Sequence, residues 1–146
     1  MNDNLIDEIK SLNIMIGNKL FDINKDNLIS KYPSPLQYAI CNYLDNNNDR
    51  DIYQKDLQEE FHISKAAISD VVNSMEKKNI ITRIPSSIDG RLNKIIMTDF
   101  GIECFSKIKS NNNKFNNKLS DCLSDDEANT FISTINKLKN YIEGID

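Results

Sequence analysis

Residues 53–98 read YQKDLQEEFHISKAAISDVVNSMEKKNIITRIPSSIDGRLNKIIMT, and three local patterns follow one another there without a gap. The central pattern, from Ser64 to Lys78, is a helix with two different faces at about 100° per residue. Its apolar face consists of Ile68, Val71, Val72 and Met75. Its small and polar face consists of Lys65, Ala66, Ser69, Asp70 and Asn73, with Lys77 near the end. Such a helix can pack on a core with one face and enter the major groove of DNA with the other.

The segments on either side of this helix predict a helix-turn-helix followed by a β-hairpin. In the turn His62-Ile63-Ser64, Ile63 is an apolar anchor and Ser64 can cap the helix. After the helix, Asn79 suits a left-handed C-cap, because its short amide tolerates positive φ. Residues 80–84 and 92–98 then read as strands around a tip at 86–90. A hairpin in this position is a wing.

This stretch resembles the MarR-type winged-helix transcription regulators, without a gap over residues 53–98. The residues that carry the resemblance are Leu57, Ile63-Ser64-Lys65, Met75-Glu76-Lys77-Lys78, Asp89-Gly90-Arg91, Met97-Thr98 and Gly101. The chain departs from the family at His62 and Asn79, where glycine is usual, and at Asp70, where arginine is frequent. The resemblance implies a mainly α fold with a small β wing, in which a winged helix-turn-helix is flanked by N- and C-terminal dimerisation helices.

Bulk composition is compatible with a cytoplasmic protein that is either one domain or one elongated protomer with two tightly joined parts. The chain has 146 residues, and no apolar run approaches the ~20 residues of a membrane span. Its start, MNDNLIDEIK, lacks the order of a signal peptide. The net charge is −4, but the segment from Ser64 to Lys94 has six positive and three negative side chains. A locally basic surface on an acidic body favours double-stranded DNA as a partner.

Cysteine and histidine usage argues against redox, metal and catalytic sites. Cys41, Cys104 and Cys122 are odd in number and form no C-x-x-C pair, so we interpret them as reduced, small buried side chains. His62 is the only histidine, which rules out a His-rich metal site within one chain. No catalytic motif is present. We therefore expect no metal, no cofactor and no enzyme activity.

The remaining segments predict helices with broad apolar stripes. Residues 3–25 repeat apolar residues at steps of three and four, Lys31-Tyr32-Pro33 ends that helix, and Ser34 to Gln37 starts a second one that runs to about Leu44. Ile52 is a candidate for a short third strand. After Thr98, a fifth helix precedes a last helix that starts at the capping box Ser124 to Glu127. The last helix has an apolar seam of Ala128, Phe131, Ile135, Leu138, Ile142 and Ile145.

These stripes have two interpretations, an intramolecular bundle or a homodimer interface, and we favour the homodimer. The predicted division is then a dimerisation region at 1–31 and 99–146 and a winged helix-turn-helix at 32–98. Two protomers would present their helices to successive major grooves roughly 34 Å apart, on a pseudo-palindromic site.

The expected DNA contacts lie on the helix at 64–78 and on the wing. They are Ser64, Lys65, Ala66, Ser69, Asp70, Asn73, Lys77, Asp89, Arg91 and Lys94, with Arg83 as a lesser phosphate contact. Asn73 suits adenine, Arg91 suits the minor groove, and Asp89 would orient Arg91. The alternative is an ordinary solvated helix face and an Asp-Gly turn that serves the backbone alone.

The resemblance also implies an effector site, because members of the family often release DNA when a small aromatic molecule enters a crevice beside the dimerisation helices. Met15, Tyr38 and Tyr43 are the residues expected to line it. The sequence thus predicts a homodimeric, sequence-specific DNA-binding regulator, in particular a repressor. The alternative is a winged-helix protein-interaction module of the anti-repressor type, which Asp70, Glu76 and the acidic total favour.

Overall fold

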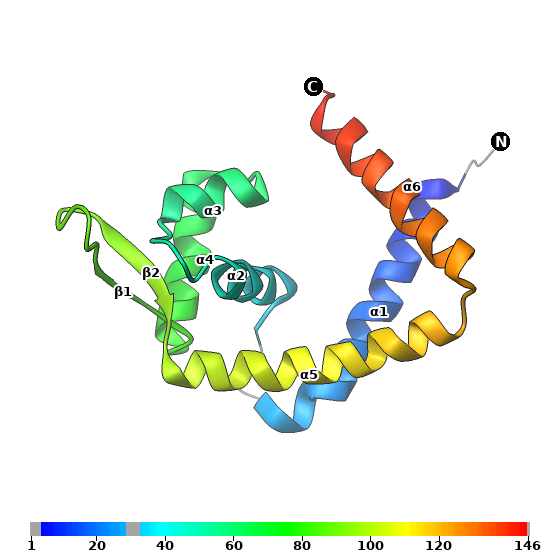
Figure 1. The fold of residues 1–146 in the computed structure, drawn as a ribbon, viewed down its shortest axis with the longest axis horizontal. Coiled ribbons are helices and arrows are strands. Elements are labelled where there is room, and N and C mark those ends of the chain that lie inside the picture. Colours follow the sequence, from blue (N-terminus) through cyan, green and yellow to red (C-terminus); the bar gives the residue numbers. More distant parts are fainter. Residues whose placement is uncertain (1–3, 29–32, 146) are drawn as a thin grey trace. The chain divides into compact units, whose positions relative to one another are not determined.

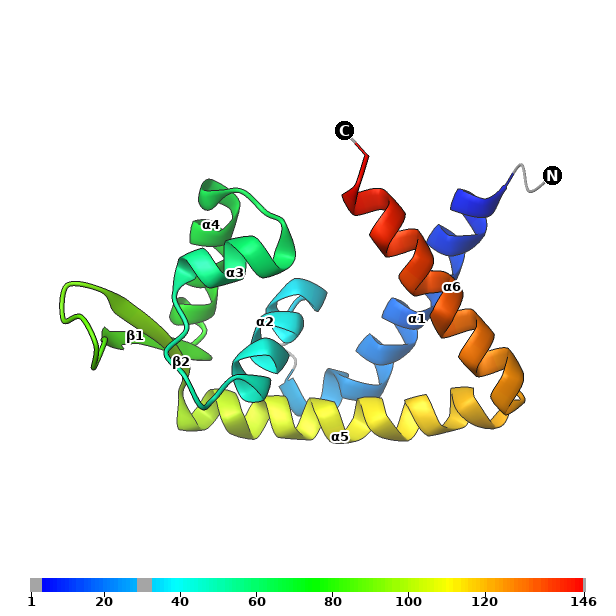
Figure 2. The same cartoon turned by 45° about the horizontal axis from the view of Figure 1, so that its top comes forward.

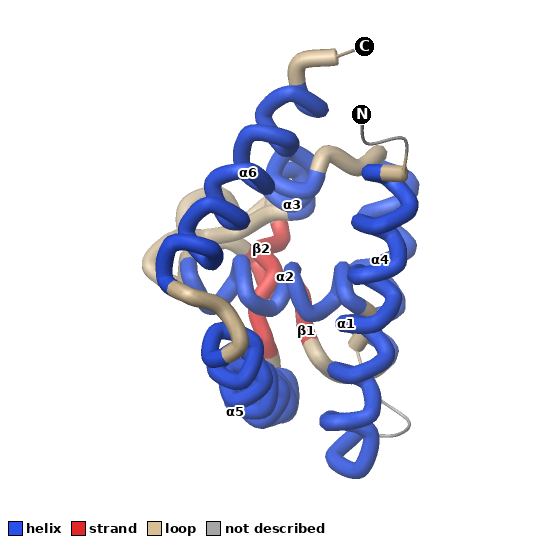
Figure 3. Tube along the Cα trace, turned by 90° about the vertical axis from the view of Figure 1, so that its right-hand side faces the viewer, coloured by secondary structure: helices blue, strands red, loops and turns tan. Residues whose placement is uncertain are grey.

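The chain forms six helices and one β-hairpin over the part that the computed structural model describes, residues 4–28 and 33–145. The helices are α1 (Leu5–Leu28), α2 (Pro35–Asn46), α3 (Gln54–Phe61), α4 (Lys65–Lys77), α5 (Asp99–Asp121) and α6 (Asp125–Glu143), and the strands are β1 (Ile81–Pro85) and β2 (Asn93–Met97) (Figure 1). Strands are confined to one hairpin, as the tube in Figure 3 shows. The predicted fold class, mainly α with a small β wing, is confirmed.

Two compact units divide the chain, Met1–Lys109 and Ser110–Asp146, with the boundary inside α5. The first unit holds the helix-turn-helix and the wing. The second holds the C-terminal part of α5, a short turn and α6. The predicted helix end at Lys31-Tyr32-Pro33 lies largely outside the described residues. Within the described ranges, no helix is both long and apolar enough to cross a membrane.

Local sequence signals account for where these helices begin and end. Ser34 and Gln37 form the predicted capping box of α2, and Ser124 with Glu127 forms that of α6. His62 ends α3 at φ 52°, and Asn79 follows α4 at φ 60°, both in the left-handed region. A left-handed residue therefore follows each helix of the helix-turn-helix, and the left-handed conformation predicted for Asn79 is present.

The core of the first unit lies between α2, α3, α4 and the hairpin, which Figure 2 shows grouped together. Ile40 of α2, Leu57 of α3, and Ile68 and Val72 of α4 are fully buried in it. Truncating such a side chain to Ala costs roughly 2–5 kcal/mol, because the cavity left behind is only partly filled. This core fixes α4 by one face and leaves its other face uncovered.

The wing is a two-stranded antiparallel hairpin in the register Ile81↔Met97 to Pro85↔Asn93. The prediction of a third strand at Ile52 is wrong, since Ile52 is not in a strand. Its carbonyl oxygen nonetheless accepts one hydrogen bond from the Ile95 N–H of β2, at 2.7 Å. Tyr53 begins the cap of α3 immediately afterwards, so the extended segment is too short to pair further.

The interpretation of the cysteines as buried is correct for Cys41 and Cys104 and wrong for Cys122, which is exposed at the end of α5. Burial, together with the neighbouring Cys104, raises the pKa of the Cys41 thiol to about 12. A thiol with so high a pKa is protonated at neutral pH and is a poor nucleophile.

Candidate nucleic-acid interface

Helix α4 has one buried and one exposed face, as its sequence predicts. Ile68, Val72 and Met75 are fully buried. The exposed side chains are Lys65, Ala66, Asp70, Asn73 and Lys77, and Ser69 between them is half-buried. The Ser64 hydroxyl accepts a hydrogen bond from the Ala67 N–H at 3.1 Å, which makes it the N-cap. The remaining N–H groups of the first turn and the helix dipole favour an anion at this end.

Asn73, which the sequence predicts to read a base, is held by an arginine from the wing. Arg83 of β1 donates from Nη2 to Asn73 Oδ1 at 2.8 Å. Its Nε lies 3.9 Å from Oε1 of Glu76, one turn of α4 from Asn73. Arg83 therefore joins the wing to α4, and its predicted phosphate contact would require it to leave these partners. The Asn73 Nδ2 amide group remains available as a donor.

The wing tip presents a nearly fully exposed arginine. Arg91 is 90% exposed, and its guanidinium pairs with the Asp89 carboxylate through Nε to Oδ1 at 3.1 Å and Nη2 to Oδ2 at 3.0 Å. The Arg91 backbone N–H also donates to Asp89 Oδ1, at 3.0 Å. These hydrogen bonds lower the pKa of Asp89 and raise that of Arg91. Asp89 thus orients Arg91, in the arrangement expected from the sequence.

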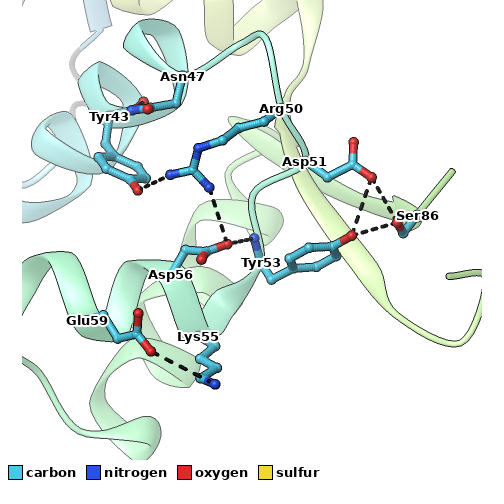
Figure 4. Close-up of polar contacts among 9 residues, drawn as sticks. All are labelled: Tyr43, Asn47, Arg50, Asp51, Tyr53, Lys55, Asp56, Glu59 and Ser86. Carbon is cyan, nitrogen blue, oxygen red and sulfur yellow. Dashed lines mark hydrogen bonds and ion pairs between the residues drawn. The ribbon is translucent and has the colours of Figure 1, made fainter. Parts of the chain in front are cut away.

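The start of the wing's tip loop is joined to the linker between α2 and α3 by a group of polar side chains that sequence reasoning missed. Figure 4 shows Asp51, Tyr53 and Ser86 turned toward one another. Ser86 Oγ lies 2.8 Å from Asp51 Oδ2 and 2.6 Å from the Tyr53 hydroxyl. Lys94 of β2 pairs with Asp51 Oδ1 at 3.4 Å, so this predicted phosphate contact already has an acidic partner. No spacing pattern could have found the group, because its members come from segments more than 30 residues apart.

The electrostatics of Asp51 follow from these partners. The hydrogen bond from Ser86 is the largest cause that lowers the pKa of the Asp51 carboxyl, and Lys94 and Tyr53 lower it further. Partial burial acts in the opposite direction and does not cancel them. Asp51 is therefore charged over the physiological pH range.

The residues expected to line an effector crevice have separate surroundings. Met15 of α1 is exposed. The ring of Tyr38 packs on Phe105 with a centroid distance of 5.3 Å, and that of Tyr43 packs edge-on against Phe61 at 6.1 Å. The Tyr43 hydroxyl also accepts a hydrogen bond from Arg50 at 2.7 Å, as Figure 4 shows. The two tyrosines thus contribute to packing within the first unit.

Apolar side chains are exposed on both the N-terminal helix and the second unit. On α1 they include Leu5, Ile9 and Leu12. On the second unit the exposed apolar side chains are Leu119, Leu123, Phe131, Ile132, Tyr141, Ile142 and Ile145. Phe131, Ile142 and Ile145 lie on the seam that the sequence predicts for the last helix, whereas Leu123, Ile132 and Tyr141 lie outside it. The apolar side chains of α1 belong to the stripe predicted for the first helix.

Comparison with known sequences gives a family match over the winged helix. Residues 33–92 match the model of the MarR family. The HTH-type transcriptional regulator YdgJ of Bacillus subtilis (strain 168) is 26% identical over 96 residues, which span 66% of this chain and 58% of that protein. The match thus covers less than two thirds of the relative's own length.

Comparison with solved structures extends the likeness to most of the chain. The transcription regulator MarR from Oenococcus oeni PSU-1 has 23% identity and a TM-score of 0.73, over 96% of this chain and 99% of that one. The MepR–DNA complex of S. aureus has 19% identity and a TM-score of 0.72, over 90% and 94%. These likenesses concern the fold. Together with the match of residues 33–92 to the MarR family model, they confirm the resemblance to MarR-type winged-helix regulators.

Proposed function

We propose that the protein is a homodimeric, sequence-specific DNA-binding regulator that reads a pseudo-palindromic operator and represses transcription by occluding a promoter. The observation that carries the proposal is the exposed small and polar face of α4 beside a wing whose Arg91 is 90% exposed. Small side chains allow the helix to enter a major groove, and an exposed arginine at the wing tip suits the minor groove. We expect such a regulator to act in the cytoplasm.

The proposed contacts divide into three kinds. Ser64 with the first amides of α4, Lys77 and Lys94 would contact phosphates, which sets affinity and its dependence on salt. Arg91 would enter the minor groove, oriented by Asp89. The side chains proposed to meet base edges are Lys65, Ala66, Ser69, Asp70 and Asn73. Among these, Asp70 can only accept, so it suits the amino group of cytosine.

A second copy of the chain is the proposed occupant of the exposed apolar side chains of α1 and of the second unit. Burying them stabilises association by about 25 cal/mol for each Å² removed from water. A two-fold dimer would place two copies of α4 on successive major grooves, which explains why the expected operator is a pseudo-palindrome.

A salt-titrated gel shift on the DNA upstream of the protein's own gene tests the proposal. We expect a specific shift that survives an excess of unrelated DNA and weakens steeply as salt rises. Light scattering of the free protein should give twice the mass of one chain. The absence of any shift at ~50 mM salt would reject the DNA-binding role.

The alternative function is a module that docks on another protein through the same face. The exposed carboxylate of Asp70 on α4 favours it, since phosphate repels a carboxylate. A protein partner retained in a nuclease-treated pull-down, combined with no DNA shift, is the result that this alternative predicts.

An aromatic effector that releases DNA is the last element of the proposal, with Met15, Tyr38 and Tyr43 as its contacts. Since Tyr38 and Tyr43 already pack on Phe105 and Phe61, an effector would have to replace these ring contacts. Adding benzoate to the gel shift as a probe should weaken the complex. If neither benzoate nor phenol changes the affinity, this element is rejected.

A further inference from the structure

We propose that Asp51, Tyr53 and Ser86 form a clamp that fixes the angle of the wing and makes them positioning residues for DNA binding, although they need not touch DNA. The proposal rests on the DNA-binding function proposed above. It assigns a role to a group of side chains at the start of the wing's tip loop, which Figure 4 shows turned toward one another.

The hydroxyl of Ser86 is the centre of the clamp. The residue is only 6% exposed. Its Oγ accepts hydrogen bonds from the backbone N–H groups of Ile88 at 3.1 Å and Asp89 at 3.3 Å, both in the wing tip. It donates to Asp51 Oδ2 at 2.8 Å and lies 2.6 Å from the Tyr53 hydroxyl, a contact in which either hydroxyl can be the donor, while the Tyr53 hydroxyl also lies 3.4 Å from Asp51 Oδ2. One hydroxyl thus connects the tip to the linker between α2 and α3.

Asp51 extends the clamp to the second strand. Its Oδ1 lies 3.4 Å from Nζ of Lys94 in β2, and its Oδ2 accepts from Ser86, which follows β1. The neighbouring Ile52 carbonyl accepts from the Ile95 N–H at 2.7 Å. The linker therefore contacts both sides of the hairpin, at Ser86 directly after β1 and at Lys94 and Ile95 within β2.

The position of the clamp along the wing determines what it controls. Pro85 and Asn93 form the last pair of the ladder, and Arg91 lies beyond them in the loop at 86–92. This loop has two backbone hydrogen bonds of its own, from the Ser86 N–H to the Leu92 carbonyl at 2.8 Å and from the Leu92 N–H to the Asp89 carbonyl at 3.0 Å. A two-stranded hairpin is marginally stable without outside contacts. The direction of Arg91 relative to α4 consequently depends on contacts from outside the hairpin as well. Arg83 supplies such a contact to α4 from β1, and the clamp supplies those at the start of the loop.

The clamp residues are poorly placed to contact DNA themselves. The Asp51 side chain is only 12% exposed, and both of its oxygens are engaged. Breaking the clamp should therefore loosen Arg91 without removing a phosphate contact. The expected signature is a weaker affinity with an unchanged salt slope, which differs from the signature of losing Arg91 itself.

The test combines a measurement without DNA and one with DNA. The chain contains no tryptophan, so Ile88→Trp places a single fluorophore at a wing-tip position that is 85% exposed. In this background, Ser86→Ala and Tyr53→Phe should each give faster local depolarisation in time-resolved anisotropy. The matched control is Ser87→Ala, which alters the next, exposed serine and removes only a contact of 3.4 Å with Asp51.

With the native Ile88, Ser86→Ala and Tyr53→Phe should lower operator affinity roughly three- to tenfold, the range expected for losing one or two hydrogen bonds. The salt slope should stay at the parent value. Equal anisotropy decays for Ser86→Ala, Tyr53→Phe and Ser87→Ala would overturn the clamp. A salt slope of Ser86→Ala or Tyr53→Phe that falls by about one below the parent value would overturn it as well. If Ser86→Ala does not fold, the comparison of the milder Tyr53→Phe with Ser87→Ala decides whether the clamp holds the wing.

Failure of the clamp and failure of the proposed function are distinguishable. If the parent protein binds no DNA, the proposed function fails, and the anisotropy comparison still decides whether the clamp holds the wing. If the parent protein binds its operator and the two clamp variants bind equally well, the positioning role is overturned while the DNA-binding function stands.

Discussion

The Arg83 guanidinium of β1 holds the Asn73 side chain of α4, with Nη2 2.8 Å from Oδ1. The oxygen of Asn73 is therefore occupied from the side of the wing, and its amide hydrogens are the part left to meet a base. A bidentate contact with adenine needs both the oxygen and the amide group. The contact with Arg83 thus favours a base edge that accepts, such as N7 or O6 of guanine.

Replacing Asn73 should change base preference more than general affinity. We expect Asn73→Ala to reduce discrimination at one operator position by about 1–3 kcal/mol, because one directed donor is lost and no charge is removed. Binding to four operators that differ only at that position measures this effect. Asn48→Ala, an exposed asparagine in the loop after α2, is the matched control. Unchanged discrimination in Asn73→Ala would exclude Asn73 from base reading.

Replacing Arg91 should change the salt dependence of binding. Arg91→Ala removes an exposed positive charge from the wing tip, so the slope of log affinity against log salt should become shallower by about one. A titration between low and physiological salt measures the slope. Lys55→Ala is the control, since it removes an exposed positive charge from α3, where Lys55 pairs with Glu59 at 4.0 Å. Identical slopes for the two variants would contradict a role for Arg91 at the DNA.

The helices and their ends could be predicted from the sequence because their signals are local. Periodicity identified the buried face of α4, and the capping boxes at Ser34 and Ser124 marked two helix starts. The left-handed conformation of Asn79 was predictable for the same reason, because its short amide tolerates positive φ. In each case the relevant atoms lie within four residues of one another.

The contacts that join the wing to the rest of the first unit could not be predicted, because they depend on tertiary packing. Asp51 and Ser86 are 35 residues apart, and either would read as an ordinary surface residue. The prediction of a strand at Ile52 was wrong for the same reason. Ile52 forms one backbone hydrogen bond with β2, and α3 begins too soon afterwards for a strand to form. Residue type led us to expect a buried Cys122, but residue type alone cannot decide whether anything covers this side chain.

The three cysteines should differ in how fast their thiols react with a thiol reagent. The Cys41 thiol is buried and its pKa is raised to about 12, whereas Cys122 is exposed. We expect Ellman's reagent to modify Cys122 first in the native protein, and Cys41 and Cys104 only on unfolding. Mass spectrometry of the partly modified protein identifies the site. Modification of Cys41 as fast as that of Cys122 would contradict the burial of this side chain.

The pH dependence of stability should reveal the carboxylate of Asp51. Its pKa is lowered in the folded protein, chiefly by the hydrogen bond from Ser86. A lowered pKa means that the charged form stabilises the fold above the carboxyl's ordinary pKa, and that this contribution disappears as pH falls through the lowered value. Urea unfolding of the wild type and Asp51→Asn should therefore differ near neutral pH and converge in acid.

The matched control for this pH series is Glu59→Gln, since Glu59 forms an exposed ion pair with Lys55 at 4.0 Å. Exposed pairs of this kind contribute at most about 1 kcal/mol. The same carboxylate-to-amide change should therefore have little effect there at any pH. The difference in the free energy of unfolding between wild type and Asp51→Asn could instead stay constant from neutral to acid pH. That result would show that the charge of Asp51 is not what stabilises its contact with the wing.

The start of α5 depends on a glycine that lies against the backbone after α4. A Cβ on Gly101 would overlap the carbonyl oxygen of Ile80, which is main chain and cannot rotate away. Thr98 holds this junction from the other side, because its Oγ1 donates to the Asn79 carbonyl at 2.6 Å and accepts from the Gly101 N–H at 2.9 Å. Gly101→Ala should therefore lower the free energy of unfolding by roughly 1–3 kcal/mol, the usual cost of overpacking.

The same substitution at Gly17 of α1 should change the free energy of unfolding in the opposite direction. Nothing lies within 4 Å of a Cβ built on Gly17, and its position inside a helix favours alanine. Gly17→Ala should raise the free energy of unfolding by about 0.5–1 kcal/mol, because alanine loses less backbone entropy on folding. Urea titration of both variants compares them directly. If Gly101→Ala proved as stable as Gly17→Ala, α5 could not begin as close to Ile80 as the structure places it, and the wing would lack its rigid attachment on that side.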